Sequence, residues 1–256
     1  MGVEFTKEDH VAYITLNRPD AMNSLDPESV TRLAEIWNEV IKDDDIRVSV
    51  LTGAGEKSFC TGTDMKKTPP PQECMASIWL RDGQPIIPHM RMWKPIICAI
   101  NGYAIGGGLE MALACDLRIA STKAKFGLTE VKVASLAGLN GTQCIPRAIP
   151  QAVAMKMLLT GELIDATEAH RVGLVSDIVE PAELMNLAKS LALKIAGNAP
   201  LSVKAAKQAA VMGLEMPLEH GIAFSHLLWG ALRDTEDRKE GFTAFAEKRA
   251  PRWKGR

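Results

Sequence analysis

The chain has 256 residues, of which 46% are hydrophobic and 24% charged, and this composition is typical of an ordinary globular protein. Its 30 basic and 31 acidic side chains nearly cancel, which argues against nucleic acid or an anionic membrane as the main partner. Five cysteines without C-x-x-C spacing are typical of reduced thiols. No stretch approaches the ~20 apolar residues of a membrane span, and we expect a cytoplasmic protein.

Strands and helices are predicted to alternate in the first part of the chain. Residues 10–17 are rich in β-forming residues and predict a strand, and residues 46–52 predict a second. Asp26-Pro27-Glu28 is a helix-start signal, because Asp caps a helix well and Pro suits its first position. Residues 75–93 are predicted to be helical. The residues that follow the start signal at helical spacing are Val30, Leu33, Trp37, Val40 and Ile41.

The middle of the chain predicts a buried strand, a buried helix and another strand. Residues 95–101 form a short apolar run that fits a strand covered on both faces. Residues 109–115 are apolar almost all round and predict a buried helix. Residues 116–121 predict a further strand. The α/β alternation in this region therefore predicts a sheet with helices packed on it.

The rest of the chain is predicted to be mainly helical. The turn signal Gly197-Asn198-Ala199-Pro200 divides an α/β core, residues 1–197, from a helical region, residues 198–256. A stripe of Leu184, Leu187, Ala188, Leu191 and Ile195 marks the core-facing side of one helix. The predicted helices are 151–160, 166–172, 183–195, 201–212, 218–231 and 235–248.

Three glycines, Gly106-Gly107-Gly108, stand directly before the predicted helix 109–115. They suit a tight strand-to-helix turn, and they equally suit free N–H groups aimed at a developing negative charge. A donor placed on a forming oxyanion lowers a reaction barrier by ~3–4 kcal/mol. Glu110 lies in the first turn of this apolar helix, where a buried carboxylate is costly unless it serves a function.

A second carboxylate and a second loop complete the candidate site. Glu130 follows Phe126-Gly127 and by itself reads as a surface acid, but with Glu110 it can form an acid–base pair. The loop of residues 58–64 can supply another amide, although a plain loop capped by Asp64 is the favoured local interpretation. The five histidines show no metal-binding spacing, and no phosphate-loop or nucleophile-elbow motif is present.

Several segments together resemble the enoyl-CoA hydratase/isomerase (crotonase) superfamily, and the match covers nearly the whole chain. The most specific segment is Asn101-Gly-Tyr-Ala-Ile-Gly-Gly-Gly-Leu-Glu110. The others are Leu16-Asn-Arg-Pro19 with Asn23-Ser-Leu25, Phe59-Cys-Thr-Gly-Thr-Asp64, Phe126-Gly-Leu-Thr-Glu130, Gly141-Thr-Gln143, Asp165-Ala-x-Glu168-Ala-x-x-x-Gly173-Leu-Val175 and residues 240–249.

The resemblance implies a spiral of ββα units followed by trimerising helices, assembled as a trimer or hexamer. It implies an acyl-CoA substrate, with coenzyme A as part of the substrate, and no metal or other cofactor. By position, the thioester oxygen would be held by the backbone N–H groups of Thr63 and Gly107, with Glu110 as base and Glu130 as acid. Gly138 would help to position the catalytic water. The predicted substrate-binding residues are Cys60, Asp64, Met65 and Gly106.

This chain departs from the common pattern of the family in the loop between residues 134 and 144. Ala134, Ala137, Asn140 and Cys144 replace a glycine, a proline, a second glycine and an arginine, and Thr61 replaces an alanine. The retained glutamate pair favours syn addition of water to a 2-enoyl-CoA. The alternatives are a double-bond isomerase, a specialised lyase such as a crotonobetainyl-CoA hydratase-like enzyme, a non-catalytic RNA-binding member, and an acyl-CoA-binding protein without turnover.

Overall fold

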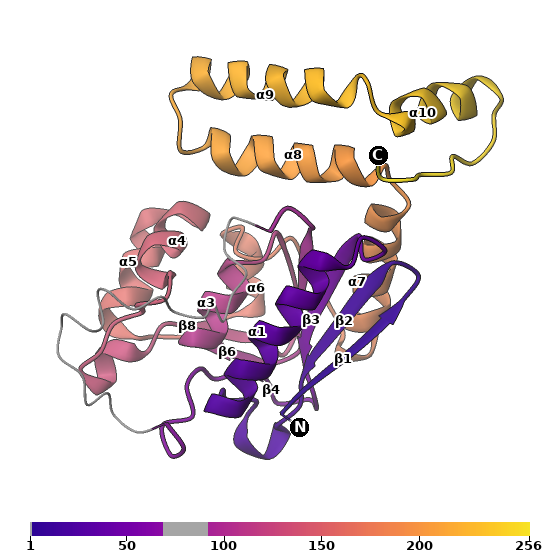
Figure 1. Cartoon of the computed structure of the whole chain (residues 1–256). Helices are drawn as coiled ribbons and strands as arrows, with labels where there is room; N and C mark the ends of the chain where they lie inside the picture. The colour runs from indigo at the N-terminus through magenta and orange to yellow at the C-terminus, as the bar shows by residue number, and fades with distance from the viewer. Residues whose placement is uncertain (1, 69–91) are drawn as a thin grey trace.

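The structure is a computed structural model that describes residues 2–68 and 92–256 (Figure 1). Two sheets form its centre. The larger one has the strand order β1-β2-β3-β5-β7-β10, and the smaller one has the order β4-β6-β8-β9. The pairs β1–β2 and β8–β9 are antiparallel, and the other pairs are parallel. The strands are β1 (Val3–Glu8), β2 (Val11–Leu16), β3 (Val48–Gly53), β4 (Ser58–Cys60), β5 (Ile96–Ile100), β6 (Tyr103–Ile105), β7 (Leu117–Ser121), β8 (Lys125–Gly127), β9 (Ile164–Asp165) and β10 (Asp177–Val179).

The chain winds between the two sheets as a spiral. Each turn leaves one strand in the larger sheet and the next strand in the smaller one: β3 then β4, β5 then β6, β7 then β8. A helix follows β6, and this is α3 (Gly107–Leu113). The repeat brings the ends of β4, β6 and β8 side by side, and the loops that leave those ends carry the candidate site residues.

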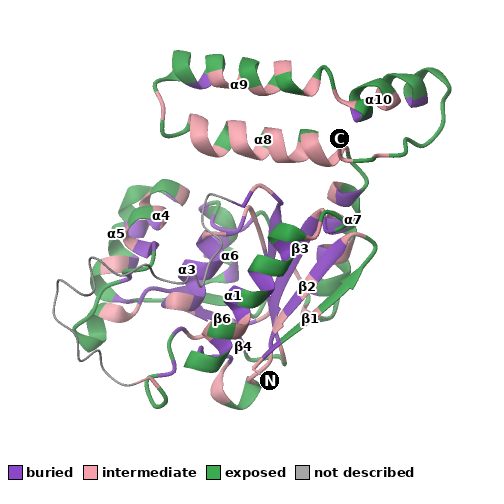
Figure 2. Ribbon diagram, viewed as in Figure 1, coloured by how far each residue is buried: buried purple, intermediate pink, exposed green. Residues whose placement is uncertain are grey.

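The larger sheet is covered on both faces, which explains its apolar central strands. On one face, α7 (Leu184–Ala196) packs its buried small residues against β3, β5 and β7. On the other face lies the main core, which includes side chains of α1 (Pro27–Lys42) and α3. All five residues of β5 are buried, as the prediction of a strand covered on both faces requires. Figure 2 shows this concentration of buried residues in the sheet and in α3.

Further helices follow the spiral. They are α4 (Gly141–Ala148), α5 (Gln151–Thr160), α6 (Ala166–Arg171), α8 (Pro200–Gly213), α9 (Leu218–Leu232) and α10 (Glu236–Ala246), with short 3-10 turns at Pro19–Ala21, Glu130–Val133 and Pro181–Glu183. Within the described residues, none of the helices is long and apolar enough to cross a membrane. In Figure 1, α8 and α9 lie antiparallel above the rest of the molecule, and Figure 2 shows much of α9 and α10 exposed.

The last residues return to the start of this helical region. The indole Nε1 of Trp253 donates to the carbonyl of Gly197 at 2.7 Å. The buried carboxylate of Asp237 accepts from the N–H groups of Lys254 and Gly255, at 2.7 and 2.9 Å. The C-terminal end of the chain therefore lies beside the N-terminal end of α8, as Figure 1 shows.

Most of the longer predicted elements are confirmed, with ends that differ by one or two residues. Asp26 caps α1 by accepting from Ser29 N–H at 3.0 Å, as the start signal predicts. Ile41, which was placed on the core face of that helix, is half exposed, whereas Ile36 is buried. The prediction missed β1 and β10 of the larger sheet, the short strands of the smaller sheet and α4. The predicted helix 75–93 lies almost entirely outside the described residues, and the boundary at residue 198 falls between α7 and α8.

Candidate active site

The loop after β4 touches the start of α3 through main-chain atoms. A Cβ atom added to Gly108 would lie 2.1 Å from the carbonyl oxygen of Cys60, and one added to Gly107 would lie 3.4 Å from the Cα of Gly62. A backbone atom cannot rotate out of the way as a side chain can, so residue 108 must be glycine for this contact. The glycine run therefore allows two backbone segments to meet where the candidate amides lie.

The N–H groups of Thr63 and Gly107 are both free at this meeting point. Leu25 forms a bridge with the loop, in which Leu25 N–H donates to Gly62 O and Asp64 N–H donates to Leu25 O, at 2.8 and 2.9 Å. This bridge leaves Thr63 N–H unused. Gly107 is the first residue of α3, so its N–H has no partner in its own helix. Across residues 2–68 and 92–256, neither group donates to a protein acceptor.

Glu110 lies in the same helix and is only 2% exposed. Its Oε1 accepts from the N–H groups of Asn140 and Gly141, at 2.9 and 2.8 Å. Asn140 is the cap of α4 and Gly141 is its first residue, and the free N–H groups of a helix start are suited to a negatively charged acceptor. The main chain at the start of α4 thus binds the Glu110 carboxylate through two hydrogen bonds. The neighbours Leu109, Met111, Ala112 and Leu113 are buried, which confirms the prediction of a buried helix.

Glu130 reaches the start of α3 from a different segment. It begins the 3-10 turn after β8, and its Oε1 would lie 3.0 Å from a Cβ atom added to Gly106. Its other oxygen, Oε2, is buried and has no hydrogen-bond partner in the described part of the chain. Burial, together with the nearby negative charge of Glu110, raises the pKa of Glu130. Glu130 therefore retains a proton more readily than an ordinary glutamate.

The remaining predicted site residues lie around these groups in different environments. Gly106 has a positive φ of 54°, which favours glycine, at the cap of α3. Gly138 lies in the exposed turn that leads to Asn140. Cys60 is fully buried, and burial raises the pKa of its thiol to about 12. The side chain of Met65 is largely exposed.

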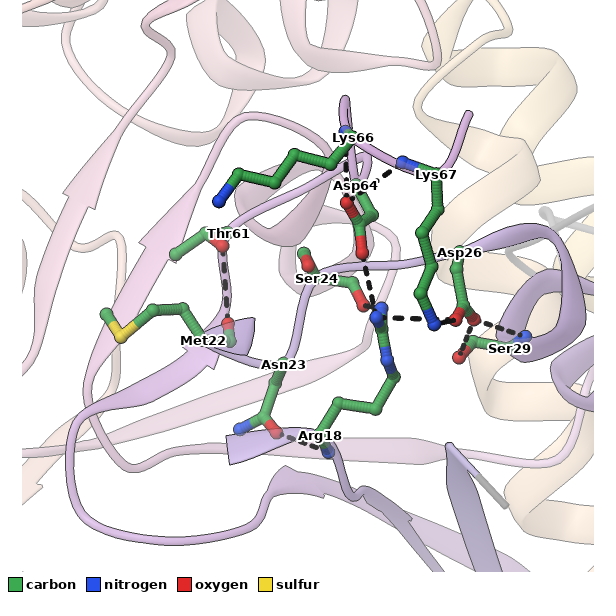
Figure 3. Close-up of polar contacts among 10 residues, drawn as sticks. All are labelled: Arg18, Met22, Asn23, Ser24, Asp26, Ser29, Thr61, Asp64, Lys66 and Lys67. Carbon is green, nitrogen blue, oxygen red and sulfur yellow. Dashed lines mark hydrogen bonds and ion pairs between the residues drawn. The ribbon is translucent and has the colours of Figure 1, made fainter. Parts of the chain in front are cut away.

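Asp64 is engaged by an ion-pair cluster, which Figure 3 shows. Its Oδ2 accepts from the guanidinium of Arg18 at 2.7 Å, and the same guanidinium lies 3.3 Å from Asp26. Asp26 also pairs with Lys67 at 3.0 Å. Arg18 holds the pKa of Asp64 below its ordinary value, and the Ser29 hydroxyl does the same for Asp26. The cluster ties the residue next to Thr63 to the cap of α1.

The sequence interpretation missed the residues that hold the site together. Arg18 belongs to the matched segment Leu16-Asn-Arg-Pro19, but its contact with Asp64 joins residues 46 apart in the chain. Asn140 and Gly141 contact a residue about 30 positions earlier. One local signal was available, because Asn is common at the position directly before a helix, where free N–H groups occur. Within the described residues, no group of three or more His, Cys, Asp or Glu side chains is arranged to hold a metal ion.

Known proteins resemble this chain over its whole length. The sequence model of the enoyl-CoA hydratase/isomerase family matches residues 6–256. The (E)-benzylidenesuccinyl-CoA hydratase of Thauera aromatica is 76% identical over 255 residues, which cover 100% of both chains. The short-chain-enoyl-CoA hydratase of Clostridium acetobutylicum is 40% identical over 97% of this chain and 95% of its own. The crystal structure of an enoyl-CoA hydratase from Bacillus anthracis superposes with a TM-score of 0.92, at 36% identity and full coverage of both chains.

Proposed function

The chain belongs to the enoyl-CoA hydratase/isomerase family and is a hydratase of enoyl-CoA-type thioesters, and we propose that it adds water syn across the 2,3 double bond. In this proposal the thioester oxygen accepts from Thr63 N–H and Gly107 N–H. Donors aimed at this oxygen stabilise the enolate more than the starting thioester, because the negative charge develops there. The observation that carries the proposal is two N–H groups that no acceptor among the described residues uses, Thr63 in the loop after β4 and Gly107 at the start of α3, with two glutamates beside them.

The two glutamates take different roles because their environments differ. Glu110 accepts the proton of the attacking water while the water oxygen bonds to C3 of the substrate. The electron pair of the double bond moves toward the thioester oxygen. Glu130 then delivers its proton to C2, and the raised pKa of Glu130 favours the protonated form that this step requires. Glu110 in α3 and Glu130 in the 3-10 turn after β8 both lie beside the start of α3, and in this proposal they act on the same side of the alkene, so the hydroxyl and the proton add to one face.

Removal of either carboxylate tests this assignment. Glu110→Gln and Glu130→Gln keep the shape of the side chain, and each is expected to lower the turnover of crotonyl-CoA by about 10²–10⁴-fold. The control is Glu180→Gln, which changes an exposed glutamate far from these residues in the sequence. Turnover is followed by the loss of the conjugated thioester absorbance. Wild-type rates in either active-site variant would refute the proposed role of that glutamate.

We further propose that the preferred substrate carries an aryl group and a free carboxylate in addition to the thioester. The support is the 76% identity to the (E)-benzylidenesuccinyl-CoA hydratase, over the full length of both chains. Such a thioester bears a phenyl ring on the alkene and an additional negative charge. We expect kcat/KM to be highest for benzylidenesuccinyl-CoA, lower for cinnamoyl-CoA and lowest for crotonyl-CoA. A preference for crotonyl-CoA would refute this proposal, and turnover of a trans-3-enoyl-CoA alone would favour an isomerase.

The proposal extends to the state in which the enzyme works. We propose a cytoplasmic homotrimer or dimer of trimers that uses no cofactor besides the coenzyme A of its substrate. Large apolar side chains of α9 and α10 are exposed in the single chain, and a second copy would cover them. Light scattering after size-exclusion chromatography measures the assembly directly, and a monomer would contradict it. The exposed side chains are Leu218, Leu227, Trp229, Phe242 and Phe245.

A further inference from the structure

Asn140 contacts Glu110 through its side chain as well as through its main chain. Its N–H donates to Glu110 Oε1 at 2.9 Å, and its Nδ2 donates to the carbonyl oxygen of Glu110 at 3.1 Å. The residue is 7% exposed and stands directly before α4. Asn140 therefore binds both the carboxylate and the backbone of Glu110.

The orientation of the Asn140 amide follows from its partner. A carbonyl oxygen can only accept, so Nδ2 must face Glu110 and Oδ1 must point away. Oδ1 is then buried, and it has no hydrogen-bond donor among the described residues. A buried acceptor without a partner destabilises the folded state. Glycine, which the family pattern carries at this position, would avoid that cost.

The side-chain contact also fixes the distance between α3 and the start of α4, which the two main-chain bonds to Oε1 do not fix. Glu110 O already accepts from Ala114 N–H at 3.2 Å in the last turn of α3. The added bond from Nδ2 joins this turn of α3 to the start of α4. The two bonds to Oε1 hold only the tip of a flexible side chain. Because the same loop holds both the side-chain tip and the backbone of Glu110, the carboxylate cannot move relative to α4.

We propose that Asn140 is a positioning residue for Glu110, and that its side chain sets the placement of the base toward the attacking water. The inference rests on the proposed function, since it assumes that Glu110 is the base. It explains why this chain retains a buried amide where the related pattern has glycine. Small displacements of a catalytic group lower the rate strongly, because the reacting atoms must approach to about 3–3.5 Å.

Two variants of Asn140 test the inference. Asn140→Gly retains both N–H bonds to Oε1 and removes only the carboxamide, and it restores the glycine of the family pattern, which keeps the fold accessible. Asn140→Asp keeps the shape but puts an acceptor against Glu110 O. We expect kcat for the hydration of crotonyl-CoA to fall about tenfold in Asn140→Gly and further in Asn140→Asp, with KM within twofold of wild type. Asn186→Asp makes the matched change at an exposed asparagine.

Exchange of the α-proton separates positioning from general damage to the site. In D2O, Glu130 and the two N–H groups can exchange the α-proton of butyryl-CoA without the water that Glu110 activates. We expect both Asn140 variants to keep wild-type exchange rates while they lose hydration. Loss of both activities, or hydration at the wild-type rate in both variants, would overturn the inference. If Glu110→Gln also hydrates crotonyl-CoA at the wild-type rate, the proposed base fails. If only the Asn140 variants do so, the proposed function stands without this inference.

Discussion

The two sides of the proposed site are held by different forces. The loop that carries Thr63 is tied down by charged side chains, with Arg18 between Asp64 and Asp26 (Figure 3). Glu110 is held by N–H groups at the start of α4, and α3 is held by a glycine contact. The ion-pair side can therefore be weakened by titration or by the loss of one charge. The main-chain side is disturbed chiefly by an added atom where two backbones touch.

The largest effect is expected when an atom is added on the main-chain side. In Gly108→Ala, the new methyl group would lie 2.1 Å from the carbonyl oxygen of Cys60, so α3 must move. We expect hydration to be nearly abolished and the free energy of unfolding to fall by about 1–3 kcal/mol. Thermal unfolding and turnover measure the two effects. Gly230→Ala in α9 is the matched control, because its methyl group would meet no atom within 4 Å among the described residues of the single chain. A Gly108→Ala enzyme as stable and active as wild type would show that the contact is not needed.

The side of the site that carries Glu110 and Glu130 should lose activity as the pH rises. The pKa of Glu130 is raised by burial, and hydration requires its protonated form, so kcat should fall as the pH rises through that raised pKa. The stability follows the same direction, because the folded state binds this proton more tightly than the unfolded chain does. Its contribution is present at low pH and is lost as the pH rises through the folded-state pKa. Glu130→Gln should therefore melt at a higher temperature than wild type at neutral pH, and unchanged melting would contradict this account.

The ion-pair side should instead lose stability as the pH falls. The pKa values of Asp64 and Asp26 are lowered, so their contribution to stability is complete above the ordinary carboxyl range and is lost as the pH falls through the lowered values. Arg18→Met removes the shared cation. We expect acid unfolding to begin at a higher pH than in wild type, and kcat to fall about tenfold, equivalent to roughly 1.4 kcal/mol. Acid titration by circular dichroism checks the first effect, and a wild-type acid midpoint would argue against the cluster.

The smallest effect is expected for Lys67→Ala, which removes a different cation from Asp26. The Lys67 side chain is 60% exposed, whereas that of Arg18 is 15% exposed. Exposed ion pairs contribute only about 0–1 kcal/mol because water and salt screen them. We expect kcat to change less than twofold and melting to shift little. An effect as large as that of Arg18→Met would mean that net charge, rather than the buried contact, holds the loop.

The sequence predicted the parts of the fold that carry a local pattern. The cap at Asp26 and the buried strand around Cys98 each follow from neighbouring residues, and both are confirmed. The predicted stripe of α7 also packs against the core, with Leu184 and Ala188 buried and Leu187, Leu191 and Ile195 partly buried. The strands β4, β6 and β8 have three residues each, which is too short for an alternating pattern to be visible. They form because β4 and β8 each pair in parallel with β6 in the smaller sheet.

The candidate site depends even more on contacts between residues that are distant in the sequence, and local patterns do not predict these. Glu110 was recognisable because a carboxylate is unusual among apolar helical residues. The bonds that hold it come from Asn140 and Gly141, and no sequence pattern of a single chain connects positions 30 apart. Arg18 and Asp64 are paired across 46 positions for the same reason. Long-range contacts of this kind depend on how the spiral stacks its turns, which only the folded structure reveals.

The return of the chain end to Gly197 has a consequence for the order of folding. Trp253 and Gly197 are 56 residues apart in the chain, and the bond between them closes a loop that contains α8, α9 and α10. The entropy lost on closing a loop of this length is best offset after the enclosed helices have formed. The amide hydrogens of Lys254 and Gly255 should thus exchange with solvent only when the whole loop opens, and they provide a reporter for its cooperative unfolding.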